Sequence, residues 1–532
     1  MGLEGASAAA AEQLKPSDVR LVIAASSLGT VFEWYDFFIY GTLATIVGRT
    51  FFPASSPTVE LLYSLAGFAV GFGFRPLGAV LFGYFGDKLG RKYTFLVTIT
   101  LMGLATAAVG FVPSAAEIGF AAPAILILLR VLQGLALGGE YGGAAIYVAE
   151  HASPKRRGFY TSFIQGSVAG GFILSLAVVL GTQAVLGDAA WNAWGWRFPF
   201  IFSLALLGIS LWMRLKLSES PVFRAMKEAG ETARNPLKET FTYPGNIRPL
   251  LVALFGIGAG LTVIWYTAMF QSLYFLQNAM KLEQSVAQTL VGIGAGSGLV
   301  FFVFFGWLSD KVGRKGPIVT GYVLTLLLLF PVFWMMGDAA NPGLSDAARE
   351  APVVVGGRDC RYSPFAKVQA TECGRTLDML TKRGVPYAVD ERLAGVIVGE
   401  HGIASGYPSE AELDAALKAA GYDLGRVRPD GARIAVILLG ILILSALSGM
   451  TYGPVAALLS ELFPPRIRYS SMSIPYHIGT GYFGGFLPLV SQYIVAKTGD
   501  PFSGLWYTWA VVAMALAVTV GFLRKDDLRH LA

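Results

Sequence analysis

The amino-acid sequence predicts an all-α membrane protein with twelve transmembrane helices in two six-helix halves, the second of which is interrupted by a small α/β insert. Three observations lead to this prediction. Of the 532 residues, 54% are hydrophobic and only 14% are charged, with a mean hydropathy of +0.57, whereas a soluble domain carries about 25% charged residues. Apolar segments long enough to cross a bilayer recur along the chain. One loop motif also occurs twice, once in each half.

The apolar segments define the predicted helices and the boundary between the halves. A helix that crosses the hydrocarbon core needs about 20 mostly apolar residues. The predicted spans are residues 19–47, 60–85, 93–113, 120–148, 159–184, 198–214, 250–276, 285–308, 317–337, 433–458, 471–496 and 503–523. The sequence therefore divides into a first half at 1–214, a linker at 215–249 and a second half at 250–532.

Basic residues in the short loops predict the orientation of the chain. They are concentrated on one side, in clusters such as Lys88, Arg91 and Lys92. The short loops of the other side carry few of them, namely Arg49, Arg197, Lys281 and Lys497. Because Lys and Arg favour the cytoplasmic side, we expect a multi-pass protein of the bacterial inner membrane with both termini and the linker in the cytoplasm.

The two halves repeat each other. Residues 83–92 (GYFGDKLGRK) match residues 306–315 (GWLSDKVGRK) at six of ten positions, at an offset of 223 residues. A second pair, Glu150-x-x-x-Pro-Lys-x-Arg157 and Glu461-x-x-x-Pro-Arg-x-Arg468, has an offset of 311. The difference requires an insertion of about 88 residues in the second half. Parallel halves of this kind are typical of one class of secondary transporter.

The insertion is the polar segment 338–432. About a quarter of its residues are charged, which is close to the share in a soluble domain. We expect a strand at 353–355, and Ser409 and Glu412 form a capping-box pattern that opens a helix ending near Gly421. The predicted topology places the insert in the oxidising periplasm, which favours a Cys360–Cys373 disulfide over two free thiols.

Charged and polar residues inside the predicted spans are the first candidates for function, because charges are costly in a membrane. In the first half they are Glu33, Asp36, Tyr40, Arg75, Arg130, Gln133 and Glu140. The spacing i, i+3, i+7 places the first three on one face of a helix. Arg130, Gln133 and Glu140 can line one wall, whereas Gly134, Gly138 and Gly142 form a small-residue face suited to close helix contact.

Asp36 and Arg130 are predicted at similar depth and therefore as partners, with Glu33 and Arg75 as a second pair. A neighbouring guanidinium favours the charged carboxylate, whereas dehydration favours the neutral acid. A site that balances the two effects can take up a proton when substrate or conformation disturbs it. The alternative is a static ion pair that only joins two helices.

Polar residues of other spans are the candidates for the rest of a substrate cavity. They are Gln165, Trp265, Tyr266, Gln271, Tyr452, Tyr476 and His477. The alternative for the aromatic residues is packing, and for His477 it is a hydrogen-bonded position in the core.

The repeated loops are candidates for a cytoplasmic latch that holds one conformation closed. The residues of this predicted latch are Gly83, Asp87, Gly90, Arg91, Lys92, Glu150, Arg157, Gly306, Asp310, Gly313, Arg314, Glu461 and Arg468. Asp87 and Asp310 can accept hydrogen bonds from Arg or cap the N-terminus of a neighbouring helix. The alternative is a basic loop that only sets topology.

These motifs resemble the major facilitator superfamily, and the two repeated loops are similar to its signature. Further motifs resemble its metabolite:proton symporter family, which includes transporters of α-ketoglutarate, citrate, shikimate and proline/betaine. They are residues 33–37 (EWYDF), 75–78 (RPLG), 130–134 (RVLQG), 138–142 (GGEYG), 194–200 (WGWRFPF) and 461–469 (ELFPPRIRY). The chain departs from the family in its insert and at His477, where the family pattern has Asn.

The resemblance implies a monomer with the major facilitator fold, whose halves rock about a central cavity to move a small organic acid or zwitterion with protons. By the same resemblance, Asp36 and Arg130 match the first-helix acid and fourth-helix arginine used in coupling. The expected partners are protons, a small-molecule substrate and the lipid bilayer, with no nucleic acid and no cofactor.

Three functions remain open at this point. The first is proton-coupled import of an organic acid or zwitterionic osmolyte, favoured by the membrane cations Arg75 and Arg130. The second is a proton-driven exporter of drugs or metabolites. The third is a sensor whose insert binds a periplasmic ligand. An enzyme is not expected, because the sequence carries no metal cluster, nucleophile elbow or phosphate-binding Gly-Lys-Ser/Thr loop.

Overall fold

The computed structural model describes most of the chain. The described residues are 16–54, 56–89, 91–139, 145–146, 148–149, 152–215, 236–358, 360–366, 368–402, 406–464 and 467–524. Within these ranges, the side chains of 16–26, 83–89, 91–95, 154, 214, 236, 401–402 and 469 are not described.

The first half is a bundle of helices. Its helices are α2 (Pro16–Thr42), α3 (Ala44–Phe51), α4 (Pro57–Gly73), α5 (Arg75–Leu89), α6 (Arg91–Val109), the short α7 (Ala115–Ile118), α8 (Ala121–Gly138), α10 (Arg157–Ala193) and α11 (Phe198–Leu215). The predicted first span is broken at Leu43, between α2 and α3. The predicted fifth span is longer than expected, because α10 continues to Ala193 across a break at Gly187, whose φ of 74° favours glycine.

The second half is also helical, with π-helical turns in two of its predicted spans. The first of these comprises α14 (Ile247–Leu251), η3 (Val252–Gly258), α15 (Ala259–Tyr266), η4 (Thr267–Gln271), α16 (Ser272–Tyr274) and η5 (Phe275–Ala279). The others are α17 (Gln284–Val312), α18 (Lys315–Ala340), α22 (Gly431–Tyr452), α23 (Val455–Leu462), α24 (Arg468–Ile478) with η7 (Gly479–Gly485) and α25 (Leu487–Thr498), and α26 (Leu505–Phe522). π-Turns inside helices occur frequently at functional sites.

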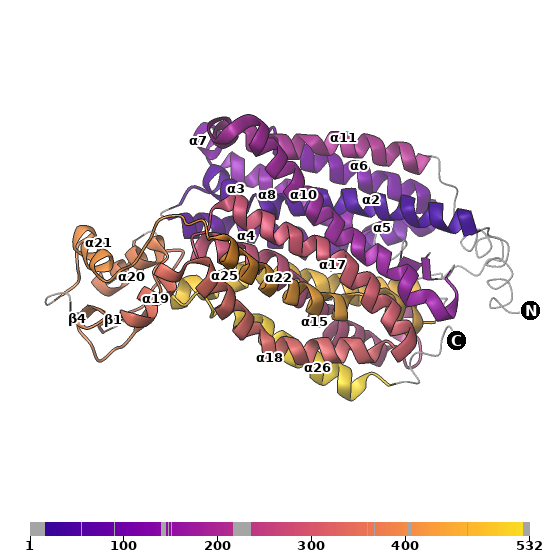
Figure 1. Cartoon of the computed structure of the whole chain (residues 1–532). Helices are drawn as coiled ribbons and strands as arrows, with labels where there is room; N and C mark the ends of the chain where they lie inside the picture. The colour runs from indigo at the N-terminus through magenta and orange to yellow at the C-terminus, as the bar shows by residue number, and fades with distance from the viewer. Residues whose placement is uncertain are drawn as a thin grey trace, which may run out of the picture.

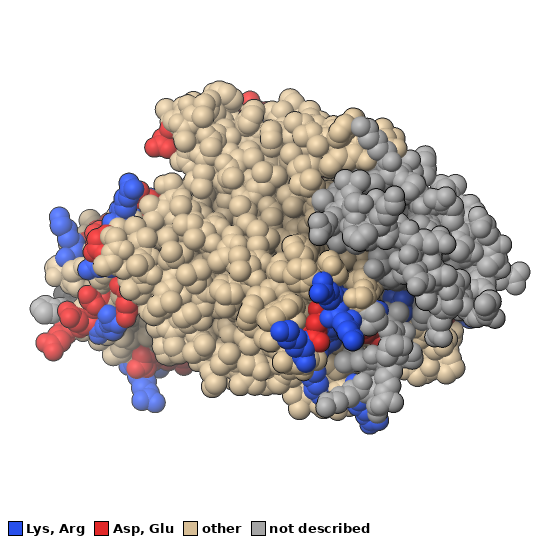
Figure 2. Space-filling model, turned by 45° about the vertical axis from the view of Figure 1, so that its right-hand side comes forward, with Lys and Arg blue, Asp and Glu red and all other residues tan. Residues whose placement is uncertain are grey.

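Nine of the described helices or continuous helical segments are long and apolar enough to cross a membrane. They are α4–α5, α8, α10, α11 with its preceding 3-10 turn η2 (Gly195–Arg197), α14–η5, α17, α18, α22–α23 and α26. The remaining predicted intervals, 19–47, 93–113 and 471–496, are also mainly helical. Figure 2 shows a broad band without charged side chains on the face in view, with charges towards the two ends. The count of twelve spans stays a prediction.

The halves pack against each other along several helices. α10 of the first half packs along α17 of the second, and α4 and α5 pack against η7 and α24. A single large apolar core extends through both halves. Functional residues from the two halves are therefore brought together at this interface.

The insert is a small α/β fold, as predicted, with its own apolar core. After α19 (Pro342–Glu350), it forms β1 (Val353–Gly356), α20 (Glu372–Arg383), β2 (Tyr387–Val389), β3 (Gly395–Val398), β4 (His401–Gly402) and α21 (Glu410–Ala419). The sheet order is β2-β1-β3-β4, with β1 parallel to β2 and antiparallel to β3. The predicted strand is β1. The predicted capping box is also confirmed, because Ser409 and Glu412 exchange hydrogen bonds at the start of α21.

A disulfide joins Cys360 to Cys373, as predicted, with a Cα–Cα distance of 5.2 Å. The insert lies at one end of the bundle, and the first residues of α2 and the last residues of α26 lie at the opposite end (Figure 1). We call these the insert end and the terminal end. This arrangement agrees with the predicted topology, although the side of the membrane on which each end lies stays a prediction.

The insert contacts both halves. Phe365 lies between Tyr63 of α4 and Tyr493 of α25, with ring centroids 5.4 Å and 5.9 Å apart. Leu62 of α4 and Ala496 of α25 belong to the apolar core of the insert. The insert therefore covers the insert end of the interface between the halves.

Candidate functional site

Arg130 is the central cation of the first half. The side chain is fully buried on α8, and its Nη1 donates to Oε1 of Gln133 at 2.6 Å. Nε2 of Gln133 donates to Oγ1 of Thr106 at 2.8 Å, and this hydroxyl lies 3.4 Å from the backbone oxygen of Asp36. The predicted polar wall of α8 is therefore present at Arg130 and Gln133, and it connects to α2 through α6.

Aromatic rings surround the guanidinium of Arg130. Its Cζ lies 4.3 Å from the ring centroid of Phe37, 4.4 Å from that of Tyr40 and 5.4 Å from that of Phe68. Such contacts stabilise a cation in a site that excludes water. The Nε and Nη2 atoms have no hydrogen-bond partner among the described residues. The site therefore retains donors that a ligand could use.

Asp36 is buried, but it does not form the predicted ion pair with Arg130 in the described structure. The side chain is only 5% exposed, and its Oδ1 atom has no hydrogen-bond partner among the described residues. Arg130 makes its hydrogen bond to Gln133 instead. The expectation of a direct pair was wrong because it considered only depth along each helix and ignored the neutral Gln133, one turn away.

The other first-half candidates are buried as well. Glu33 and Arg75 are 5% and 0% exposed, and Tyr40 donates to the backbone oxygen of Ser64 at 3.1 Å. Arg75 lies over the rings of Trp34 and Phe72, with its Cζ about 5 Å from each centroid. The proposed pairing of Glu33 with Arg75 stays a prediction.

The predicted glycine face of α8 forms a close helix contact. A Cβ atom on Gly134 would lie 1.9 Å from the backbone oxygen of Gly71, and one on Gly138 would lie 2.0 Å from that of Arg75. Only glycine allows the backbones to approach so closely. This contact fixes α8, and with it Arg130, against α4 and α5.

An aromatic cluster fills the interface between the halves beside these charges. We define it as Phe38, Phe68, Phe72, Phe172, Trp265, Tyr266 and Phe270. Phe38 stacks on Trp265 with centroids 5.1 Å apart, and Phe72 meets Tyr266 edge-on at 5.5 Å. Towards the insert end, Tyr274 donates to the backbone oxygen of Gly41 at 2.8 Å.

Several polar groups at this interface have no hydrogen-bond partner among the described residues. They are both amide atoms of Gln165, Nε1 of Trp265 and Oη of Tyr266. All three side chains are buried. Because buried polar groups are almost always hydrogen-bonded, each of these atoms is available to water or to a polar ligand.

The remaining second-half candidates make contacts within the protein. Gln271 accepts from Nε2 of Gln492 at 3.1 Å, and the hydroxyls of Tyr452 and Tyr476 lie 2.9 Å apart. His477 is fully buried next to Tyr476. These contacts agree with either reading of the sequence, as cavity wall or as core.

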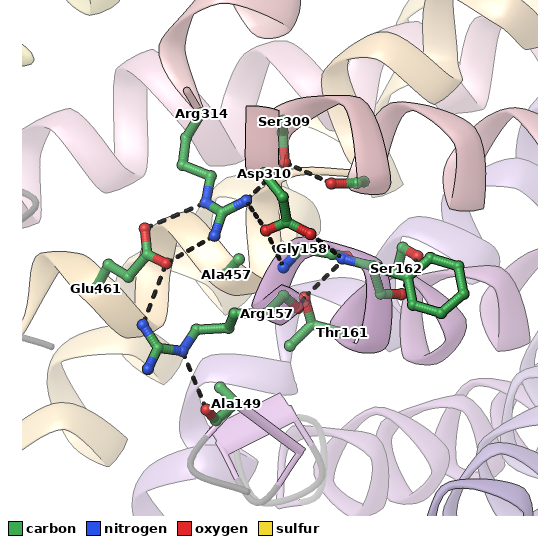
Figure 3. Close-up of polar contacts among 12 residues, drawn as sticks. Ala149, Arg157, Gly158, Thr161, Ser162, Ser309, Asp310, Arg314, Ala457 and Glu461 are labelled. Carbon is green, nitrogen blue, oxygen red and sulfur yellow. Dashed lines mark hydrogen bonds and ion pairs between the residues drawn. The ribbon is translucent and has the colours of Figure 1, made fainter. Parts of the chain in front are cut away.

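At the terminal end, an ion-pair cluster joins the halves (Figure 3). We define it as Arg157, Asp310, Arg314 and Glu461. Arg314 binds Glu461 through two hydrogen bonds of 2.9 Å and 3.2 Å, and Nη1 of Arg157 lies 3.3 Å from the same carboxylate. Glu461 therefore connects α10 of the first half to the loop between α17 and α18 of the second.

Asp310 provides a second connection across the same interface. Its carboxylate accepts from the backbone N–H groups of Gly158 and Phe159, at 2.8 Å and 2.9 Å, at the N-terminus of α10. It also pairs with Arg314 at 2.6 Å. Both predicted roles of this aspartate, arginine partner and helix cap, are present. Burial alone would lower the pKa of the Arg314 guanidinium. The hydrogen bonds that Arg314 donates to Glu461 and Asp310 outweigh this effect, so the pKa of Arg314 is raised.

The backbones are very close at this point. A Cβ atom on Gly158 would lie 2.4 Å from the backbone oxygen of Gly306, and one on Gly306 would lie 2.6 Å from Cβ of Ser162. Gly313 has a φ of 87° in the turn after α17, a conformation that favours glycine. Arg468, another residue of the predicted latch, is buried and donates to the backbone oxygen of Phe463 at 3.2 Å.

Part of the predicted latch and one cavity candidate lie outside the described residues or side chains. They are Gly83, Asp87, Gly90, Arg91, Lys92, Glu140 and Glu150.

Conversely, sequence reasoning missed Thr106 and Gln288. Thr106 carries the link from α8 to α2, and both amide atoms of the fully buried Gln288 lack a partner among the described residues. A glutamine in an apolar span, the signal that selected Gln165, could have found Gln288 as well.

Comparisons with known proteins place these features in context. A family model described as "Sugar (and other) transporter" matches residues 21–249. The chain is 30% identical to the inner membrane metabolite transport protein YhjE of Escherichia coli K12, over 96% of this chain and 94% of that protein. It is 37% identical to the shikimate transporter of the same strain, over 60% of this chain and 73% of that protein.

Solved structures show the same fold. The D-xylose-proton symporter is similar with a TM-score of 0.57, over 95% of this chain and 98% of that one, at 19% sequence identity. A partially occluded inward-open structure of the xylose transporter XylE from E. coli gives a TM-score of 0.58 at 17% identity, over 96% and 98% of the two chains. At such low identity the similarity concerns the fold alone.

Proposed function

Because the chain belongs to the major facilitator superfamily, as a relative of bacterial inner-membrane metabolite transporters, we propose that it imports a small organic acid or zwitterionic osmolyte together with protons. The proposal has two parts, the substrate class and the coupling ion. The names of the relatives, which include a shikimate transporter and an alpha-ketoglutarate permease, support the first part.

The observation that carries the proposal is the buried guanidinium of Arg130. Two of its nitrogen atoms have no hydrogen-bond partner among the described residues, and it lies near the interface between the halves. An unsatisfied buried charged donor costs free energy, and a carboxylate with its two oxygens is the natural partner of a guanidinium. A substrate carboxylate would satisfy Arg130, while Gln165 and Tyr266 would serve its other polar groups.

Asp36 is the proposed proton carrier. A buried carboxylate without a close cation is expensive, so the site favours the protonated acid when both ends are closed. When one end of the interface opens, water can reach Asp36. Hydration stabilises the charged carboxylate and therefore favours release of the proton. The hydrogen-bonded path from Arg130 through Gln133 and Thr106 to the backbone of Asp36 offers a route by which substrate binding at Arg130 influences Asp36.

Alternating access would use the closures described above. The ion-pair cluster closes the terminal end, which the sequence predicts to be cytoplasmic, the aromatic cluster fills the interface beside Arg130, and the insert covers the other end. Opening one end while the other stays closed is the requirement of this mechanism. In this assignment Arg157, Asp310, Arg314 and Glu461 form the latch that the repeated loops predict.

The test is substrate-driven proton uptake into proteoliposomes, with shikimate, α-ketoglutarate and glycine betaine as trial substrates. We expect Asp36→Asn to abolish accumulation against a gradient while it leaves substrate exchange at least partly intact. Asp188→Asn, at an exposed aspartate of α10, is the matched control and should behave as wild type. Normal accumulation by the Asp36 variant would refute the assignment of the proton carrier.

A further inference from the structure

A groove opens at the insert end, away from the central site. It has a volume of about 330 Å³, within the range of small-molecule sites. Its walls come from all three parts of the molecule. The first half contributes the start of α4, the second half contributes η5 and α25, and the insert contributes the turn between α20 and β2.

The charge of this groove has one sign. The lining includes three basic residues, Lys281, Lys382 and Arg426, and no aspartate or glutamate. Nζ of Lys382 pairs with Asp378 at 2.7 Å, and Nη1 of Arg426 donates to the backbone oxygen of Leu282 at 3.1 Å. For Lys281, the described residues provide no carboxylate partner. The groove therefore holds excess positive charge.

Two unpartnered donors belong to residues that line this groove. Nε2 of Gln277 and Nδ2 of Asn278 have no hydrogen-bond partner among the described residues, and Gln277 is only 6% exposed. Both residues line the groove next to Lys281. Because a buried amide normally finds a partner, these two N–H₂ groups indicate that an acceptor belongs in the groove.

Lys281 is held in an unusual position. It is the one non-glycine residue with positive φ, at 60°, in the described part of the chain, and such backbone strain concentrates at ligand sites. A Cβ atom on Gly384, the residue that ends α20, would lie 2.7 Å from Nζ of Lys281. Burial and the neighbouring guanidinium of Arg426 lower the pKa of this lysine, as expected where positive charges gather without a counter-ion.

We propose that this groove is a second ligand site, which binds a small carboxylate anion between Lys281, Arg426 and the amides of Gln277 and Asn278. The inference rests on the geometry of the groove and does not require proton coupling at Asp36. Because the insert forms one wall, the site exists only while the insert is docked on both halves. The bound anion would therefore favour the docked state, in proportion to its affinity.

Calorimetric titration of the purified full chain with succinate tests the proposal. We expect saturable heat of succinate binding, with an affinity that Lys281→Met lowers about ten-fold or more. Such a loss is the usual effect of removing one charged hydrogen bond. Gln277→Glu, which adds a negative charge at nearly the same volume, should abolish the binding. Lys418→Met, at an exposed lysine of α21, is the matched control and should leave it unchanged.

Two control experiments distinguish this groove from the central site and from a general anion site. Arg130→Gln should leave the Lys281-dependent component intact, whereas loss of that component would show that succinate was reporting the central site. Inorganic phosphate should bind at least ten-fold more weakly than succinate, and equal binding would overturn the assignment to carboxylates. Succinate binding that is the same in wild type and Lys281→Met, or absent from both, would overturn the site itself. A failure at Asp36 in transport assays would leave these results unaffected.

Discussion

The two ends of the interface between the halves are closed by different chemistry. At the terminal end, Glu461 binds two arginines and Asp310 caps the N-terminus of α10. At the insert end, Phe365 of the insert lies between Tyr63 and Tyr493. Buried ion pairs are directional and costly to break singly, whereas ring contacts are weaker and tolerate small displacements. One end should therefore open in a single step and the other by graded loosening.

The largest effect is expected from Glu461→Gln, which removes the shared anion of the ion-pair cluster. Arg157 then loses its described carboxylate partner, and Arg314 keeps only Asp310. We expect the closed state to lose about 3 kcal/mol or more. Ser162→Cys, buried at the Gly158–Gly306 contact, should become rapidly labelled by maleimide in this background. Because the native cysteines are both in the disulfide, a new thiol reports alone. Unchanged labelling would exclude a latch role for Glu461.

The second effect concerns the insert and tests whether the insert end depends on its fold. Changing both cysteines, Cys360→Ser with Cys373→Ser, removes a cross-link over 13 residues and should lower the stability of the insert by about 3 kcal/mol. Thermal unfolding followed by hydrogen exchange in β1 and α20 measures the loss. Ala496→Cys, at the contact of α25 with the insert core, should label faster, while Ser162→Cys should not. Equal acceleration at both positions would mean that the two closures are not independent.

A smaller effect is expected from Phe365→Ala, which removes only the ring contacts to Tyr63 and Tyr493. The loss should be about 1 kcal/mol, which corresponds to a roughly five-fold increase in labelling of Ala496→Cys. Phe365→Tyr retains the ring and serves as the control. If the alanine variant opened the insert end as completely as Glu461→Gln opens the other, the contrast between graded and single-step closure would be wrong.

The smallest effect is a difference in pH dependence. The raised pKa of Arg314 keeps its guanidinium charged between pH 7 and 9. Labelling of Ser162→Cys, divided by the labelling of an exposed reference thiol at the same pH because the thiolate is the reacting form, should therefore not change over this range. The lowered pKa of Lys281 means that its charge is lost earlier as pH rises. Succinate affinity in the groove should therefore fall from pH 7 to 9, and a rise would contradict the role of Lys281.

The sequence predicted the mainly helical architecture, because the features that determine it can be recognised in short stretches of sequence. Apolar length predicted intervals that are mainly helical in the described structure, and the difference in offset predicted an extra segment where the small α/β fold lies. The disulfide and the capping box of α21 also depend on short stretches of sequence. These features need no knowledge of how distant helices pack.

Predictions about pairs of distant residues were less successful. Depth along each helix suggested that Asp36 and Arg130 form an ion pair, but the rotation of each helix decides which side chains meet, and Gln133 is the hydrogen-bond partner of Arg130. The groove around Lys281 could not be predicted either, since its walls come from five separate segments between Thr45 and Pro501. The ion-pair cluster was easier because its motif occurs twice, and the repetition itself singled out the residues.

The position of Phe365 between the halves has a practical consequence. The insert touches both halves, so if the halves rock as proposed, these contacts must loosen and re-form in each transport cycle. An antibody fragment raised against the exposed faces of α20 and α21 would then slow the proposed transport without binding in the central site near Arg130. A small ligand that stabilises the docked insert would have the same effect on the proposed transport cycle.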